Sequence, residues 1–164
     1  MDNYHHILIA LDFSEHGNHV IRKATHLARI FRAKLSIIHV LDNIPMPDTA
    51  YGTVIPLNER STYELLETEK SKLKQIGDQL EVDAECRWMV WGVPGKEIVR
   101  LAEQEHMDLI VIGSHGRHGL ALLLGSTASD VLHHAKCDVM AIRLQDEAAE
   151  DEPLTEKAAL GSSA

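Results

Sequence analysis

The chain has 164 residues, of which 45% are apolar and 4% aromatic, a composition suited to one globular domain with a sizeable core. Its 25 acidic and 16 basic residues give a net charge of −9, which repels phosphate backbones and argues against general nucleic-acid binding. No apolar run approaches the length of about 18 residues that suggests a membrane span, and the N-terminus lacks the features of a secretion signal. We therefore expect a cytoplasmic protein that does not bind membranes.

Short apolar runs alternate along the chain with patterns of helical spacing. We expect strands at residues 4–11 (YHHILIAL), 34–41 (KLSIIHVL), 85–91, 107–112 and 138–144 (DVMAIRL). Helices are expected within residues 20–31, 66–80, 94–105 and 128–135. Such an order is typical of the α/β class and predicts one doubly wound, five-stranded parallel sheet with helices on both faces.

Two segments do not fit this pattern. Residues 42–57 contain three prolines and a glycine, which predicts an irregular excursion. Residues 145–164 are acidic and rich in small residues without sustained periodicity, so we expect a disordered tail after a domain of residues 1–144. Cys86 and Cys137 have no disulfide or metal-ligand spacing and are expected to be buried free thiols.

The segment VIGSHGRHGLALLLGST, residues 111–127, contains four glycines directly after the fourth expected strand. In open parallel sheets, ligands bind beyond the carboxyl ends of the strands where the strand order reverses, so Asp12 and Gly113 should face each other there. Gly113 and Gly116 would let the backbone approach a ligand, and Gly125 begins a helix whose N-terminus favours phosphate. The segment therefore predicts a phosphate cradle, although glycines that merely allow turns remain an alternative.

Several segments together resemble the universal stress proteins. They are ILIALDFSE, HVLD, WGVPGKEI and LIVIGSHGRHG, followed by Gly125 and Ser126, and they span about residues 4–144. The spacer between Gly116 and Gly125 is one residue shorter than in the nucleotide-binding branch of that family. The resemblance implies a Rossmann-like, adenine-nucleotide alpha hydrolase-like fold, binding of ATP or AMP, and a homodimer; Mg²⁺ could accompany ATP.

The resemblance, together with the expected strand ends, predicts a nucleotide site. Its residues are Ala10, Asp12, Val40, Ile112, Gly113, His115, Gly116, Arg117, Gly125, Ser126 and Thr127. Asp12 would accept hydrogen bonds from ribose or adenine, or would instead cap the following helix. Val40 would form an apolar wall beside adenine, and Arg117 could pair with the terminal phosphate. Ser126 and Thr127 could donate hydroxyl groups to phosphate, cap the helix, or do both.

Other kinds of site find less support. The chain has no P-loop motif, no dinucleotide-binding G-x-G-x-x-G after the first strand and no G-x-S-x-G elbow, so we assign no catalytic residue. The pairs His115 with His118 and His133 with His134 lack a recognised zinc spacing. Trp88 and Trp91 are interpreted as packing residues, since no basic residues interleave with them as in a base-stacking surface.

Three functions are compatible with these residues. We favour a regulatory stress-response protein in which an adenine nucleotide alters a dimer surface or a surface for an unknown protein partner. A slow ATPase, or a self-phosphorylating enzyme that uses Ser126 or Thr127 as acceptor, is the second, and a nucleotide-independent interaction module is the third. The homodimer is expected to pair residues 138–144, an edge strand that no proline or lysine protects; the apolar residues 120–124 are the alternative interface.

Overall fold

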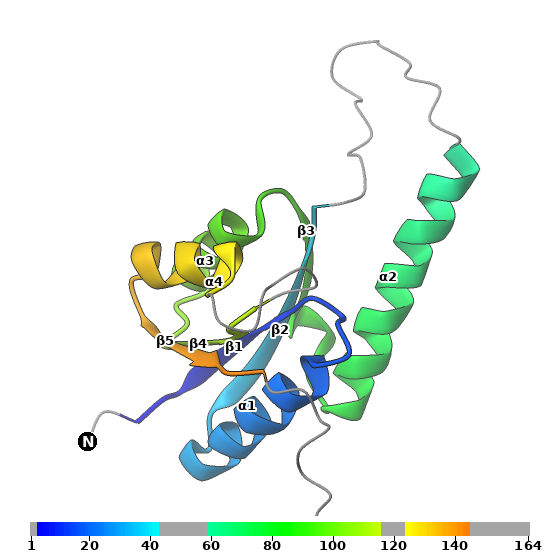
Figure 1. Ribbon diagram of the computed structural model, residues 1–164. Helices are drawn as coiled ribbons and strands as arrows, with labels where there is room; N and C mark the ends of the chain where they lie inside the picture. The colour runs from blue at the N-terminus through cyan, green and yellow to red at the C-terminus, as the bar shows by residue number, and fades with distance from the viewer. Residues whose placement is uncertain (1–2, 43–58, 116–123, 145–164) are drawn as a thin grey trace, which may run out of the picture.

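The computed structural model describes residues 3–42, 59–115 and 124–144, with the backbone alone for residues 59–61. Strands and helices alternate through these residues (Figure 1). In chain order the elements are β1 (His6–Leu11), α1 (Gly17–Phe31), β2 (Lys34–Leu41), α2 (Glu59–Gln79), η1 (Ala84–Cys86), β3 (Arg87–Trp91), α3 (Pro94–Gln104), β4 (Leu109–Gly113), α4 (Ser126–His134) and β5 (Asp138–Ile142). Of the helices in the described ranges, none is long and apolar enough to cross a membrane.

The five strands form one sheet in the order β3-β2-β1-β4-β5, and every neighbouring pair is parallel. The chain first builds outward from β1 through β2 to β3, then returns to add β4 and β5 on the other side. The strand order therefore reverses between β1 and β4, and β5 forms an edge. The predicted α/β class, the doubly wound parallel sheet and the edge position of the last strand are confirmed.

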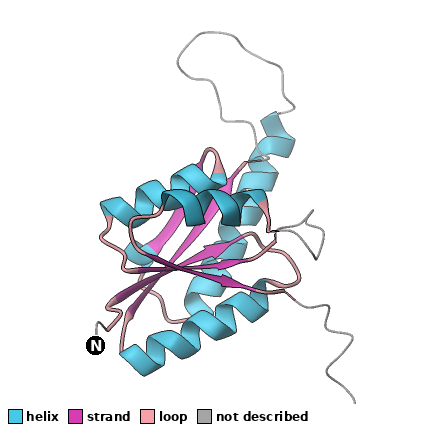
Figure 2. Cartoon of the chain, turned by 60° about the vertical axis from the view of Figure 1, so that its left-hand side comes forward, coloured by secondary structure: helices cyan, strands magenta, loops and turns pink. Residues whose placement is uncertain are grey.

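Helices cover both faces of the sheet, as Figure 2 shows. On one face, α1 and α2 pack against a core that includes Ile7 and Ile9 of β1. On the other face, α3 and α4 pack against a second core that includes Leu8 of the same strand. Because successive side chains of a strand point to opposite faces, an unbroken apolar run such as the one in β1 serves both cores.

Helix α2 packs against the sheet through its C-terminal half, where Leu73 is buried. Arg87 of β3 anchors this half by donating hydrogen bonds to the Val82 carbonyl at 2.6 Å and 2.8 Å and to Asp78 at 2.7 Å. The guanidinium lies where a side chain at Gly77 would begin. The first turns of α2 extend beyond the sheet (Figure 1), and Tyr63 there is 63% exposed.

The boundaries of several elements differ from the predicted ones. β1 begins at His6, where the Asp108 carboxylate accepts the N–H groups of His6 and of the preceding His5. β3 begins at Arg87 because the preceding residues form the 3₁₀ turn η1, and β4 extends to Gly113. The predicted excursion of residues 42–57, apart from its first residue, and the predicted tail of residues 145–164 lie outside the described residues.

The cysteines and tryptophans also test the sequence interpretation. Cys86 is a buried free thiol as predicted, but Cys137 is only partly buried, because it precedes the edge strand β5. Trp88 packs against the core beneath α3, which confirms its packing role. Trp91 is partly buried at the end of β3.

Candidate functional site

A cavity of about 400 Å³ opens at the carboxyl ends of the strands, at the point where the strand order reverses. This volume falls in the range of small-molecule sites. The ends of β1, β2 and β4 and the first turns of α1, α3 and α4 line it. The residues are Ala10, Leu11, Asp12, Ser14, Gly17, Val20, Ile38, His39, Val40, Asp42, Pro94, Ile98, Ile112, Gly113, His115, Gly125, Ser126, Thr127, Ala128 and Leu144.

Nine of the eleven predicted site residues belong to this lining, namely Ala10, Asp12, Val40, Ile112, Gly113, His115, Gly125, Ser126 and Thr127. They come from four separate segments, which the parallel sheet brings together because its strands end at one edge. Gly116 and Arg117, the other two, lie outside the described residues.

Asp12 belongs to the turn between β1 and α1. Its Oδ1 accepts a hydrogen bond from the Ser14 N–H at 2.9 Å. Helix α1 begins later, with His16 at its N-cap position and no side chain bonded to the cap. The alternative prediction that Asp12 caps this helix is therefore wrong; its carboxylate shapes the preceding turn and lines the cavity.

The opposite wall begins with α4. Gly125 is the N-cap residue, so Ser126 and Thr127 are the first two helical residues, and no side chain caps the helix. The alternative role of Ser126 and Thr127 as caps is thus wrong. Because the first N–H groups of a helix lack acceptors within it, the first turn of α4 presents donors and a positive dipole end to the cavity.

Ser114 fixes the distance between β4 and α4. Its N–H donates to the Ile142 carbonyl of β5, and its carbonyl accepts from the Gly125 N–H, both at 2.7 Å. The end of β4 and the start of α4 are consequently joined by one backbone residue. The glycine-bearing ends of the predicted cradle lie side by side for this reason.

Two polar atoms in the lining lack partners. The Ser14 hydroxyl oxygen and Nε2 of His115 are shielded from solvent, and neither has a hydrogen-bond partner among the described residues. The His115 ring is oriented by its other nitrogen, which lies 2.9 Å from the Ser114 hydroxyl. Buried polar atoms are normally paired, so these two atoms suit a polar ligand.

The wall on the α3 side is apolar. Val40 is 6% exposed, and Ile98 and Ile112 are similarly buried beside it. The cavity thus joins an apolar side to a side lined by polar groups and a helix N-terminus. This combination suits a ligand that has both an apolar part and an anionic group.

Gly113 is in tighter surroundings than its sequence role suggests. A Cβ atom built there would lie 3.2 Å from Leu144 Cδ1 and 3.5 Å from Val20 Cγ2. A large side chain at this position would disturb core packing as well as the cavity. Substitutions at Gly113 therefore cannot separate ligand binding from stability.

Sequence reasoning missed Ser14, His39 and Asp42 in the lining. Ser14 lies in the segment ILIALDFSE, and the other two lie in HVLD, so both segments contained the signal. Asp42 follows β2 just as Asp12 follows β1. The position of a polar residue directly after a parallel strand would have predicted it.

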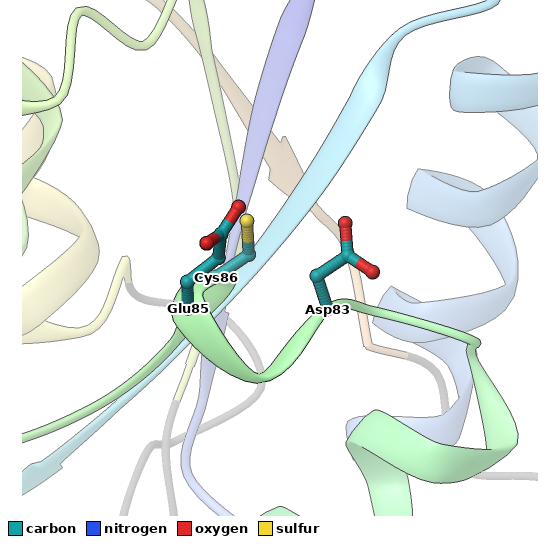
Figure 3. Close-up of side chains that lie close together, drawn as sticks. All are labelled: Asp83, Glu85 and Cys86. Atoms are coloured by element: carbon teal, nitrogen blue, oxygen red, sulfur yellow. The ribbon is translucent and has the colours of Figure 1, made fainter.

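Among the described residues, one group of three or more side chains lies close enough together to hold a metal ion: Asp83, Glu85 and Cys86 (Figure 3). This group precedes β3, so it lies at the amino ends of the strands, whereas the cavity opens at their carboxyl ends. The interaction of the Lys34 ammonium with the neighbouring Cys86 side chain raises the pKa of Lys34. A cation is thus already next to the sulfur, and we assign no metal to this group.

A model of the universal stress protein family matches residues 3–143. The chain belongs to this family. It is 37% identical over 146 residues to the universal stress protein A homolog 2 of Coxiella burnetii, covering 88% of this chain and 99% of that one. The solved structure of the universal stress protein UspA from Lactobacillus plantarum superposes with a TM-score of 0.66 at 29% identity, covering 87% of this chain and all of that one.

A further universal stress protein, solved in complex with cAMP, has the same fold with a TM-score of 0.60 at 21% identity, covering 88% of this chain and 100% of that one. The family membership and the fold implied by the sequence resemblance are thus confirmed. In the present chain, the cavity described above lies at the strand ends, where the sequence predicted a ligand site.

Proposed function

We propose that this universal stress protein is a regulatory protein of the stress response that binds an adenine nucleotide, ATP or AMP, at the carboxyl ends of β1 and β4. The observation that carries the proposal is that Asp12, Gly113 and the first turn of α4 line one shared cavity. A protein of this fold in complex with cAMP gives further support, since cAMP is itself an adenine nucleotide.

In the proposed complex the adenosine lies between β1 and β2. Asp12 accepts hydrogen bonds from ribose or adenine, and Val40 forms the apolar wall beside the base. The phosphates lie at the start of α4, where Ser126 and Thr127 donate hydroxyl groups. Arg117 remains the proposed partner of the terminal phosphate. With ATP, Mg²⁺ would be held mainly by the phosphate oxygens.

Mass spectrometry provides the direct test. Protein purified without added nucleotide is denatured, and the released small molecules are identified. Calorimetric titration of nucleotide-free protein with ATP, AMP and GTP follows, with GTP as the control for base selectivity. Release or binding of ATP or AMP supports the proposal, and the absence of both contradicts it.

A second function is suggested by the exposed Ser126 side chain, which lines the same cavity. If Ser126 Oγ attacked the γ-phosphorus of ATP, the products would be phosphoserine, ADP and the hydroxyl proton. Single-turnover incubation with labelled ATP distinguishes this activity, or hydrolysis to ADP and phosphate, from binding alone. We favour binding and a cytoplasmic regulatory role in which the bound nucleotide alters a surface for a dimer partner or another protein.

We also propose that the protein is a homodimer formed through β5. This edge strand has an exposed Ala141 and partly buried Val139 and Met140. The Ile142 carbonyl accepts from Ser114 on the β4 side, and alternate residues of a strand direct their polar groups to the same side. The N–H of Met140 therefore points toward β4, whereas that of Ala141 points to the free edge.

A proline at residue 141 removes the N–H group at the free edge, whereas a proline at residue 140 removes one that points toward β4. Replacing Ala141 is therefore the more direct test of this interface. The Ala141→Pro variant should shift a dimer toward monomer in light scattering, while Ala141→Val, which keeps the edge N–H, should remain dimeric. A monomeric wild-type protein at micromolar concentration would exclude the dimer. An unshifted Ala141→Pro dimer would favour the alternative interface at residues 120–124, of which Leu124 alone is described and is 45% exposed.

A further inference from the structure

The turn that carries Asp12 contains a backbone conformation that needs support. Phe13 has a φ of 54°, in the left-handed region that bulky residues rarely adopt. Such a conformation persists where neighbouring groups hold it in place. The Phe13 ring stacks on the His39 ring with centroids 4.0 Å apart and planes at 27°, and Lys72 Nζ lies 5.6 Å from the Phe13 centroid. Side chains of β2 and α2 thus hold this turn.

His39 is a buried residue, 3% exposed, whose ring nitrogens both face oxygen atoms. Nδ1 lies 2.8 Å from the Leu11 carbonyl oxygen, and because a carbonyl only accepts, Nδ1 must carry a hydrogen. Nε2 lies 3.1 Å from Oε2 of Glu69 on α2. In a neutral ring, Nε2 would then present a lone pair to a carboxylate oxygen, which is repulsive. The contacts therefore favour the doubly protonated imidazolium.

Glu69 also pairs with a second cation. Its other oxygen, Oε1, lies 3.0 Å from Lys72 Nζ. The Glu69 side chain is 12% exposed, and Oε2 is shielded from solvent with no well-aligned hydrogen bond, so the charge of His39 is what faces it. An ion pair removed from water is sensitive to the loss of either partner.

Among the described residues, other charged side chains lie on the elements packed around His39. Asp12 and Asp42 follow β1 and β2 in the cavity lining that includes His39, and Lys72 extends from α2. On β3 the paired residue is Met89, which is uncharged. Among the described residues, the carboxylate in contact with the ring is that of Glu69, at 3.1 Å, and it favours the charged form.

We propose that Glu69 is a positioning residue for the nucleotide cavity: through His39 and the Phe13 ring it fixes the turn that carries Asp12 and Ser14, and it thereby couples the packing of α2 to ligand binding. The inference rests on the proposed function, because it assigns a regulatory connection to that same cavity. By reciprocity, nucleotide binding stabilises the packing of α2. A partner that contacts the exposed Tyr63 and Leu65 of α2 would then sense the ligand.

The test compares Glu69→Gln with Glu67→Gln. Both glutamates pair with a lysine three residues later, at 3.0 Å and 3.2 Å, but the Glu67 side chain is 47% exposed. In calorimetric titrations with AMP, Glu69→Gln should lower affinity about tenfold and the control should change it less than about twofold. Hydrogen exchange of the Ser14 amide, which reports its bond to Asp12, should accelerate in Glu69→Gln alone.

Nitrogen NMR of the His39 ring gives a readout that packing alone would not move. At a pH of about 8, above the ordinary histidine pKa of about 6.5, the wild-type ring should show two protonated nitrogens and the Glu69→Gln ring only one. His39→Gln serves as a second variant if Glu69→Gln does not fold. The double variant Glu69→Gln/His39→Gln should bind AMP no more weakly than the weaker-binding single variant, because both changes break the same connection between α2 and the Asp12 turn.

Two results would overturn the proposal: a wild-type His39 ring with an unprotonated nitrogen at a pH of about 8, or a Glu69→Gln variant that matches the Glu67→Gln control in AMP affinity and Ser14 exchange. If the wild-type protein binds neither AMP nor ATP, the proposed function fails, and the coupling to a nucleotide fails with it. The Ser14 exchange and His39 spectra would still decide whether Glu69 positions the turn, so the two failures are distinguishable.

Discussion

Replacing Ser14 with alanine should stabilise the ligand-free protein and weaken nucleotide binding. The Ser14 hydroxyl is shielded from solvent without a hydrogen-bond partner among the described residues. An unpaired buried polar group costs about 1–3 kcal/mol, and alanine removes it with little change in volume. We expect a gain of about 1 kcal/mol, which corresponds to about 2–5 °C in melting temperature for a domain of this size.

The same hydroxyl lines the proposed nucleotide cavity. A hydrogen bond from it to the ligand would contribute about 0.5–1.5 kcal/mol, so its removal should weaken AMP binding by about 2–12-fold. Ser36→Ala is the matched control. Ser36 is 1% exposed, its hydroxyl lies 2.8 Å from Nε2 of His6, and it does not line the cavity. This variant should lose about 1–2 kcal/mol of stability and leave AMP affinity unchanged.

Urea denaturation without ligand and calorimetric titration with AMP measure the two effects. The prediction depends on the opposite signs of the two stability changes as well as on their sizes. If Ser14→Ala loses stability as Ser36→Ala does, the hydroxyl has a partner in the free protein and the reasoning is wrong. A stabilised Ser14→Ala variant with wild-type affinity would instead remove Ser14 from the ligand site.

Three further predictions test the site and the scaffold. Asp12→Ala should weaken ATP and AMP binding alike in calorimetry, whereas Ser126→Ala should weaken ATP binding more, because its contact is to the phosphates. Gly77→Ala should lower the urea midpoint, since the new methyl group overlaps the Arg87 side chain and displaces it from its carbonyl partners. Hydrogen bonds from Lys74 and Arg87 lower the pKa of Asp78. Its contribution to folding stability should therefore be present above the unfolded pKa of about 3.9 and be lost as pH falls through the lower folded value. Acid titration of the Asp78→Asn variant should lack this loss of stability.

The architecture of the protein could be predicted from its sequence because each signal is local. The apolar run of β1 and the four-residue spacing of Val20, Ala24 and Ala28 in α1 indicate element types without reference to the rest of the chain. Once the alternating order is known, parallel strands must end at one edge of the sheet. Asp12 and Gly113, which are about a hundred residues apart, could therefore be placed at one site in advance.

The support of the site could not be predicted in the same way. His39 looks like an isolated polar residue in an apolar strand, and Glu69 looks like one of many charges on α2. Their contact depends on how α2 lies across the sheet, and no periodicity encodes that angle. The left-handed conformation of Phe13 is equally hidden, because the residue type gives no signal for it.

The shortened glycine spacing shows which feature of a motif has physical importance. Spacing between Gly116 and Gly125 matters only if the connecting chain sets the distance between β4 and α4. Here Ser114 sets it, because its carbonyl accepts from Gly125 while its N–H donates to Ile142 of β5. The end of β4 and the N-terminus of α4 are thus joined at their base by backbone hydrogen bonds. A change of one residue in a loop alters closure entropy very little, so the removal of a spacer residue leaves both ends of the site where the sheet and helix hold them.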